Sequence, residues 1–324
     1  MRTELAFSAD DLAPTRFSVS PLWEVVTSFR VLASTARNPI HHTWADQVRP
    51  RIAAAGLDSG WLAELVPVSG YIPDFLTPIP HGLASTLESE LSVVRDTPTD
   101  DVRADLDRLG TFLGTRGATL RADPRARLCR LTDEIETYWE LALAPYWARI
   151  RALLDADVYH RTRQVAEHGA GHLFNDLHAT LSWDDNTLQL VRRHCLITRE
   201  STGPGLVLVP SAFASHVLTW TRSPHPPQLT YPARGAATLW ERRPVVRADA
   251  IAAVLGRTRA GILAELESPT STTTLAARIG LSAAGVSQHL TALRDAGMVS
   301  THRAGRSVLY ARTSIADSLL CDSA

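Results

Sequence analysis

The stretch that decides the fold lies near the end of the sequence and reads Thr273-Thr-Leu-Ala-Ala-Arg-Ile-Gly280-Leu-Ser282-Ala-Ala-Gly-Val286-Ser-Gln-His-Leu290-Thr-Ala-Leu293-Arg-Asp-Ala-Gly297. Its apolar residues recur at helical spacing in two short runs, which predicts two helices on either side of a Gly-Leu-Ser turn. Two helices joined by so short a turn form the helix-turn-helix unit, which places its second helix in the major groove of DNA. The stretch therefore predicts a DNA-binding segment.

The first helix and its turn follow from local chemistry. The residues expected to face inward on the first helix are Leu275, Ala276 and Ile279. Gly280 stands where that helix must stop, a place that favours the left-handed conformation. Ser282 is a good N-cap for the next helix, and Leu281 is expected to plug the corner between the two.

The second helix has one apolar face and one small or polar face. Val286, Leu290 and Leu293 recur at i, i+4 and i+7 and are expected to face the core. Small and polar groups can approach base edges and phosphates. The residues predicted to contact DNA in this segment are Thr273, Ser282, Ala283, Gly285, Ser287, Gln288, His289 and Arg294.

A β-hairpin is predicted next, because residues 298–303 and 306–312 alternate like strands around a tight Ala-Gly turn. Arg303 and Arg306 near its tip are expected to touch the phosphate backbone or the minor groove. A helix is also predicted upstream, over Ile251–Glu267. Helix pairs of this kind also occur in domains that bind no DNA, but their agreement with the wing and the upstream helix favours DNA binding.

The same residues resemble a family. Val286-Ser-Gln-His-Leu290, Ala296-Gly-Met-Val299 and Arg303-x-Gly-Arg306 are similar to the ArsR-type winged-helix repressors, over roughly residues 250–313. The resemblance implies a homodimer on a double-stranded operator of two-fold symmetry, controlled by an effector. Many members sense metals through cysteine clusters. Here no cysteine falls between Cys195 and Cys321, so sensing through a thiolate metal site is rejected.

A longer resemblance covers nearly the whole chain. Three stretches, 16–24, 70–78 and 231–241, are together similar to long ArsR-like regulators of high-GC bacteria. In those proteins a large N-terminal domain of poorly described function precedes the winged helix. The resemblance implies a regulator and says little about its ligand.

Composition bounds the remaining possibilities. The 324 residues carry a net charge of −1, so DNA contact must come from a local patch. From position 251 onward seven arginines stand against five acidic residues, a balance of +2 that indicates modest non-specific affinity and a need for dimerisation. Three scattered cysteines argue against a disulfide framework and suit a reducing cytoplasm. No apolar run suggests a signal peptide or a membrane span.

The predicted fold is mainly α with small β elements: a helical domain over 1–240, a linker at 241–248, and a winged helix-turn-helix over 249–324. Helices are predicted at 21–36, 40–55, 83–94, 99–117, 124–167 and 171–181, with Pro145 kinking or dividing the long one. Short strands are predicted at 187–191, 195–198, 206–209 and 229–231, forming a small antiparallel sheet.

The first 240 residues contain no recognisable catalytic constellation, which predicts that the protein is not an enzyme. His168 and His172 could share a helix face, yet interrupting glycines favour exposed imidazoles over a metal site. No metal or cofactor is therefore expected. Aromatic residues are candidates for a small-molecule pocket, with core packing as the alternative for each. The candidates are Tyr71, Asp74 and Phe75 in a proline-bounded loop, and Tyr138, Trp139 and Trp147 around Pro145.

Two functional hypotheses remain. In the first, the N-terminal domain senses a small organic effector, which shifts the dimer away from a geometry in which two reading helices span one DNA turn. In the second, that domain only dimerises or binds a protein partner. A cavity with convergent polar groups would favour the first hypothesis.

Overall fold

The structure is a computed structural model in which two compact units can be distinguished. It describes residues 2–6, 15–110, 113–184, 187–191, 198–199, 205–220, 225–241, 248–304 and 307–320. The first unit combines Met1–Asn38, Gly60–Thr132 and Leu153–Ala236, and the second combines Pro39–Ser59, Asp133–Ala152 and Ala237–Ala324.

These units do not follow the domain boundary expected at 241–248. Two stretches of the N-terminal part, Pro39–Ser59 and Asp133–Ala152, belong to the compact unit that contains the winged helix. The reason is tertiary packing, because rings from these stretches pack on Trp240. The linker itself lies largely outside the described residues.

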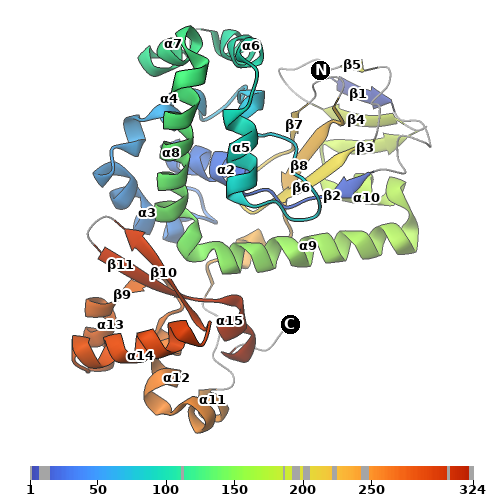
Figure 1. Cartoon of the computed structure of the whole chain (residues 1–324). Helices are drawn as coiled ribbons and strands as arrows, with labels where there is room; N and C mark the ends of the chain where they lie inside the picture. The colour runs from blue at the N-terminus through green and yellow to red at the C-terminus, as the bar shows by residue number, and fades with distance from the viewer. Residues whose placement is uncertain are drawn as a thin grey trace. The chain divides into compact units, whose positions relative to one another are not determined.

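Helices contribute more residues than strands to the described part of the first unit (Figure 1). They are α2 (Pro21–Ala33), α4 (Trp61–Leu65), α5 (Leu87–Arg95), α6 (Thr99–Leu109), α7 (Thr115–Ala122), the start of α8 (Pro124–Ala142), most of α9 (Trp147–His168), and α10 (Ala170–Leu177). Serine and threonine caps explain two of the starts. Ser20 accepts the backbone N–H of Trp23 at α2, and Thr86 forms a capping box with Ser89 at α5.

Two of the predicted helices are each interrupted by a non-helical segment, and the predicted division of the long helix at Pro145 is confirmed. The helix expected over 99–117 ends at Leu109, and α7 starts only at Thr115. The upstream helix of the winged domain is interrupted at Gly256, whose φ of 84° no helix contains. Pro145 divides the long helix as expected: α8 ends at Ala142, and a single 3-10 turn, η4 (Ala144–Tyr146), separates it from α9.

Two four-stranded sheets occur in the described part of the first unit. One has the order β3-β4-β1-β5 and the other β2-β6-β8-β7. The strands are β1 (Arg2–Ala6), β2 (Arg16–Phe17), β3 (Leu181–Asp184), β4 (Thr187–Val191), β5 (Thr198–Arg199), β6 (Val207–Ser211), β7 (Leu218–Trp220) and β8 (Gln228–Pro232).

The expectation of one antiparallel sheet is wrong. β2 and β8 both run parallel to β6, and Val209 lies opposite Thr230 in the β6–β8 pair. β7 intervenes in the chain between β6 and β8 and pairs antiparallel with β8, so the chain reverses twice and the two central strands share one direction. A parallel central strand is covered on both faces, and β6 is buried at all five positions.

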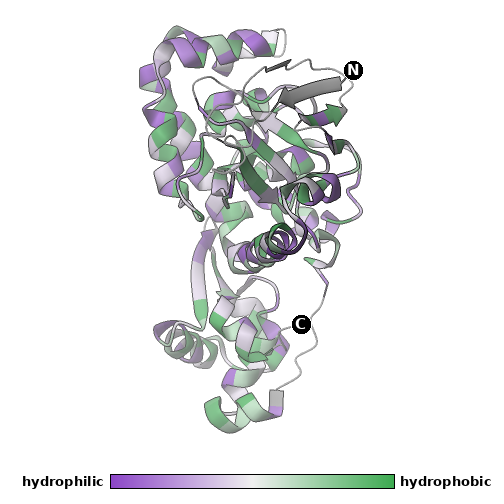
Figure 2. Cartoon of the chain, turned by 90° about the vertical axis from the view of Figure 1, so that its right-hand side faces the viewer, coloured by the Kyte–Doolittle hydropathy of each residue, from purple (hydrophilic) through white to green (hydrophobic). Residues whose placement is uncertain are grey.

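Apolar side chains from α10 and both sheets form one core of the first unit. Tyr231 on β8 is fully buried, and its hydroxyl donates to Asp157 of α9 at 2.8 Å. Figure 2 shows hydrophobic and hydrophilic residues alternating along the helices, as expected for helices with one buried face.

The second unit contains α3 (His42–Ala54), the end of α8, η4, the start of α9, and the winged helix. The winged helix consists of α11 (Ala248–Leu255), α12 (Arg257–Glu265), β9 (Thr270–Ser271), α13 (Thr272–Ile279), α14 (Ala283–Asp295), β10 (Val299–Ala304), β11 (Ser307–Arg312) and α15 (Ser314–Leu320). Its three strands form an antiparallel sheet in the order β10-β11-β9. The prediction of a mainly α protein with small β elements is confirmed.

Among the described helices, none combines the length and the apolar character needed to cross a membrane.

Candidate nucleic-acid interface

One apolar core holds the winged helix together. Its buried members are Ile262, Leu263, Leu266, Leu275, Ala276, Val286, Leu290, Leu293, Val299, Ala316 and Leu320. Every inward position expected on α14 is therefore buried, and Ile279 packs against the cluster from α13. Burying one such aliphatic side chain contributes about 1.5–3 kcal/mol, so this core fixes α14 relative to α13.

The turn between α13 and α14 is built as its sequence predicts, with one exception. Gly280 ends α13 in the left-handed region, at φ 75° and ψ 27°. The Ser282 hydroxyl accepts the backbone N–H of Gly285 at 3.1 Å and caps α14. Leu281 does not plug the corner, because its side chain is 41% exposed. The backbone N–H groups of Gly280 and Leu281 both bond to the Ala276 carbonyl, which leaves the Leu281 side chain outside the core.

The face of α14 opposite the core is open to solvent. Ala283, Ser287 and Gln288 are exposed, and Gly285 and His289 are half-buried. Thr273 on α13 and the capping Ser282 are also exposed. The structure thus brings these seven predicted contact residues to the surface of the helix-turn-helix, where small and polar groups can approach base edges and phosphates.

The predicted arginines differ in their surroundings. Arg294 at the end of α14 is exposed and pairs with the adjacent Asp295 at 2.9 Å. Arg303 on β10 is exposed and lines an open groove together with Asp133, Glu136 and Glu140 of α8. A DNA phosphate that binds Arg303 therefore competes with these carboxylates. Arg306 lies outside the described residues.

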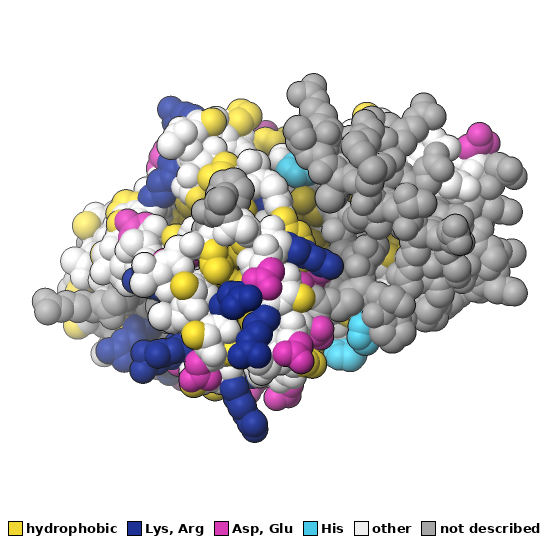
Figure 3. Space-filling model, turned by 90° about the horizontal axis from the view of Figure 1, so that it is seen from above, with side chains coloured by type: hydrophobic (Ala, Val, Ile, Leu, Met, Phe, Trp, Pro, Cys, Tyr) yellow, Lys and Arg dark blue, Asp and Glu magenta, His cyan; other side chains and the backbone are white. Residues whose placement is uncertain are grey.

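Arg312, counted above as part of the local positive charge, is buried and serves the fold. Its Nε lies 2.9 Å from Asp317 of α15. Figure 3 shows acidic and basic side chains side by side on the face seen from above.

The predicted ligand residues in the proline-bounded loop bind other parts of the first unit. The Tyr71 hydroxyl donates to Asp105 of α6 at 3.0 Å, and the same carboxylate accepts the backbone N–H of Phe75. Asp74 forms an ion pair with Arg108 at 3.0 Å. Burial, with the nearby carboxylates, raises the pKa of Tyr71 and keeps its hydroxyl protonated. These contacts hold the loop against α6.

The aromatic residues around Pro145 pack on one another. Tyr138 is fully buried, and the Trp139 and Trp147 rings meet edge to face with centroids 4.8 Å apart. The cavities of the second unit are lined by other side chains, so a ligand role for these six residues stays a prediction.

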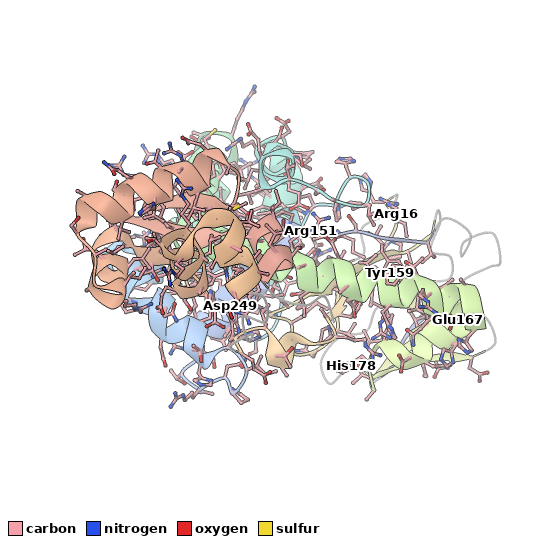
Figure 4. The ribbon with its side chains drawn as sticks, turned by 90° about the horizontal axis from the view of Figure 1, so that it is seen from below. Arg16, Arg151, Tyr159, Glu167, His178 and Asp249 are labelled. Atoms are coloured by element: carbon pink, nitrogen blue, oxygen red, sulfur yellow. The ribbon has the colours of Figure 1, made fainter. Side chains whose placement is uncertain are left out.

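No metal site is found near the two histidines considered above. The His168 and His172 rings lie 4.9 Å apart, and Glu167 is engaged by Arg163 at 2.9 Å. Figure 4 shows Glu167 near the end of α9 and His178 after α10. Within the described ranges no group of three or more His, Cys, Asp or Glu side chains is placed to hold a metal ion.

Residues that the sequence did not single out surround Trp240. Its ring stacks on Trp44 of α3 and meets Tyr146 of η4 edge to face. The three residues are far apart in the sequence, so no spacing or periodicity could have brought them together.

Comparison with known proteins finds a family match for one segment of the chain. Residues 255–302 match the model of a helix-turn-helix domain family. No curated protein and no solved structure compared with the chain matches it. The match begins at the end of α11 and ends in β10, and so includes both helices whose geometry is described above. This segment is accordingly a helix-turn-helix domain, and the protein that carries it is a DNA-binding transcription regulator.

Proposed function

We propose that the protein is an ArsR-type repressor that binds a two-fold symmetric operator as a homodimer and releases it when a small organic molecule binds. The observation that carries the proposal is the solvent-exposed face of α14, with Ser287 and Gln288 held outward by the buried Val286 and Leu290. A side chain reads a base only when its helix is held rigidly against the groove. The proposal includes no catalytic reaction.

Dimerisation is supported by apolar side chains that the winged helix leaves uncovered. α11 and α15 pack their inner faces on the common core, through Ile251 and Ala316 among others. On their outer faces Val254 is 81% exposed, Ile315 56% and Leu319 38%. Exposed aliphatic side chains on two neighbouring helices are typical of a surface that a second copy covers. Two copies would then offer two reading helices to half-sites about 34 Å apart.

A response to a ligand is supported by an open cavity within the second unit that reaches the first helix of the helix-turn-helix. A molecule bound there touches the DNA-binding segment directly. We propose repression because a ligand can release the protein from DNA simply by favouring a dimer geometry that fits the operator less well.

A fluorescence-anisotropy titration on the promoter fragment of the protein's own gene tests the proposal, with a scrambled fragment of equal length at the same salt concentration. We expect selective binding that Gln288→Ala, Arg306→Ala lowers about tenfold or more. Arg130→Ala, an exposed arginine of α8, is the matched control and should bind like the parent protein. Equal binding of both fragments by the parent protein would refute the proposal.

A further inference from the structure

An open cavity of about 820 Å³ lies within the second unit. Its lining comes from α3, from Arg149 at the start of α9, from Trp240, and from the winged helix over α12 through α13 with part of β11. Pockets that hold small organic ligands have volumes of about 300–1,000 Å³. The cavity therefore has the size of a ligand site, and the first helix of the DNA-binding motif forms part of its wall.

Trp240 supplies a rigid aromatic wall to this cavity. Its indole stacks on Trp44 at 6.1 Å between centroids, with an interplanar angle of 18°, and Tyr146 meets it edge to face at 5.5 Å. Its ring N–H donates to Nδ1 of His41 at 2.9 Å. Trp44 is fully buried, whereas Trp240 is half-buried and lines the cavity. A ring held on several sides and open on another is suited to stacking on a planar ligand.

Positive charge exceeds negative charge on the lining. Three arginines and two glutamates line the cavity, an excess of one positive charge: Arg51, Arg149, Arg278, Glu265 and Glu267. Arg278 and Glu265 lie 4.0 Å apart and offset each other. Arg51, Arg149 and Glu267 complete the charged lining, and the Arg149 guanidinium also donates a hydrogen bond to the Glu241 carbonyl. The Nη1 atom of Arg51 is buried and has no hydrogen-bond partner among the described residues. A buried guanidinium nitrogen without a partner favours an acceptor supplied by a ligand.

We propose that this cavity binds a planar aromatic carboxylate, whose ring stacks on Trp240 and whose carboxylate pairs with Arg51 and Arg149. Arginine is suited to this task because its guanidinium presents parallel N–H donors to both carboxylate oxygens. The inference rests on the proposed ligand-responsive regulator and names the chemical class of its effector.

Some of the residues that line the cavity belong to the DNA-binding segment, and one of them caps its first helix. Ser271 lines it and also caps α13 by accepting the backbone N–H of Thr274, a second lining residue. Leu309 of the wing lines it as well and pairs with Ser271 across β11 and β9. A ligand in the cavity therefore contacts the start of the helix-turn-helix and the base of the wing. It changes DNA affinity to the extent that its own affinity differs between the free and the DNA-bound conformations.

Isothermal titration calorimetry of the full chain with naphthalene-2-carboxylate tests the site. The neutral naphthalene-2-carboxamide has the same ring and no charge, and inorganic phosphate has the charge and no ring. We expect the carboxylate to bind about tenfold more tightly than either, because one charge-assisted pair and one stacked ring each contribute at least that factor. Equal affinity for the carboxylate and the amide would overturn the assignment, as would absence of carboxylate binding.

Substitutions of the lining residues test whether the carboxylate binds in this cavity. Arg51→Gln and Arg149→Gln should each weaken carboxylate binding about tenfold, whereas Arg49→Gln, an exposed arginine of the same helix outside the lining, should leave it unchanged. Trp240→Leu should weaken binding of the carboxylate and the amide alike. Circular dichroism identifies a variant that fails to fold. If folded Arg51→Gln and Arg149→Gln bind as the parent does, the proposed site is wrong.

The effects of ligand and operator on each other's binding distinguish the ligand site from the proposed function. If the ligand weakens operator binding by some factor, the operator weakens ligand binding by the same factor. Ligand binding without any effect of operator DNA would leave the site standing and overturn its regulatory role. Operator binding without carboxylate binding would overturn the site and leave the DNA-binding function standing.

Discussion

The indole of Trp240 stacks on that of Trp44 with centroids 6.1 Å apart, although the two residues are far apart in the sequence. Through this contact α3 belongs to the same compact unit as the winged helix. The Trp44 indole is anchored in turn, because its N–H donates to the Ala142 carbonyl at the end of α8 at 2.9 Å.

Trp240→Ala should destabilise the second unit by about 2 kcal/mol. A fully buried tryptophan costs about 3–5 kcal/mol on truncation, and Trp240 is half-buried. Guanidinium unfolding followed by circular dichroism measures the change. Tyr159→Ala removes a ring that is 67% exposed and should be close to neutral. A Trp240 variant as stable as the parent would show that the stack is not needed for packing.

Ser282→Ala should cost about 1 kcal/mol of unfolding free energy, because the backbone N–H of Gly285 loses the hydroxyl that caps α14. Ser287→Ala makes the same chemical change on the exposed face of that helix and should leave stability unchanged. Denaturant titration distinguishes the two variants. Equal stabilities would argue against the cap.

Gly280→Ala should destabilise the winged helix by about 1 kcal/mol, because a Cβ is strained at φ 75°. The added methyl group itself meets no atom within 4 Å, so the cost is conformational. Gly280→Asn should cost less, since asparagine tolerates the left-handed region. If alanine and asparagine lower the unfolding free energy equally, conformational strain does not explain the cost.

Stability should fall as pH rises from about 4.5 to about 8. Burial raises the pKa of Glu24 and that of Glu90 from 4.5 to about 8. Between these values the folded state keeps a proton that the unfolded state has lost, so the folded state binds more protons and each group lowers stability by at most about 1.4 kcal/mol per pH unit.

Unfolding measured across this pH range checks the sign. Glu24→Gln should flatten the decline, because the amide carries no charge in either state. Glu88→Gln replaces an exposed carboxylate of α5 and serves as the control. Stability that rises with pH in the parent protein would contradict the direction of both shifts.

The DNA-binding segment was the most predictable part of the molecule, because its signals are local. The 3.6-residue period places Val286, Leu290 and Leu293 on one buried face, and short-range capping chemistry places Ser282 at the start of α14. Pro145 divides the long helix for an equally local reason. Leu281 shows the limit of this reasoning, since whether a corner residue is buried depends on the packing around it.

Strand direction and the composition of the units were decided by contacts between distant parts of the chain. The alternation of residues in β6 and β8 predicts strands, but the parallel pairing of Val209 with Thr230 depends on where β7 leads the chain. Likewise no local pattern joins Arg51, Arg149 and Trp240 around one cavity. Periodicity and capping act within a few residues, and they determined the helices, their inward faces and the DNA-binding motif. The cavity and the division into units arise from side-chain packing across long loops, which only the folded chain can bring together.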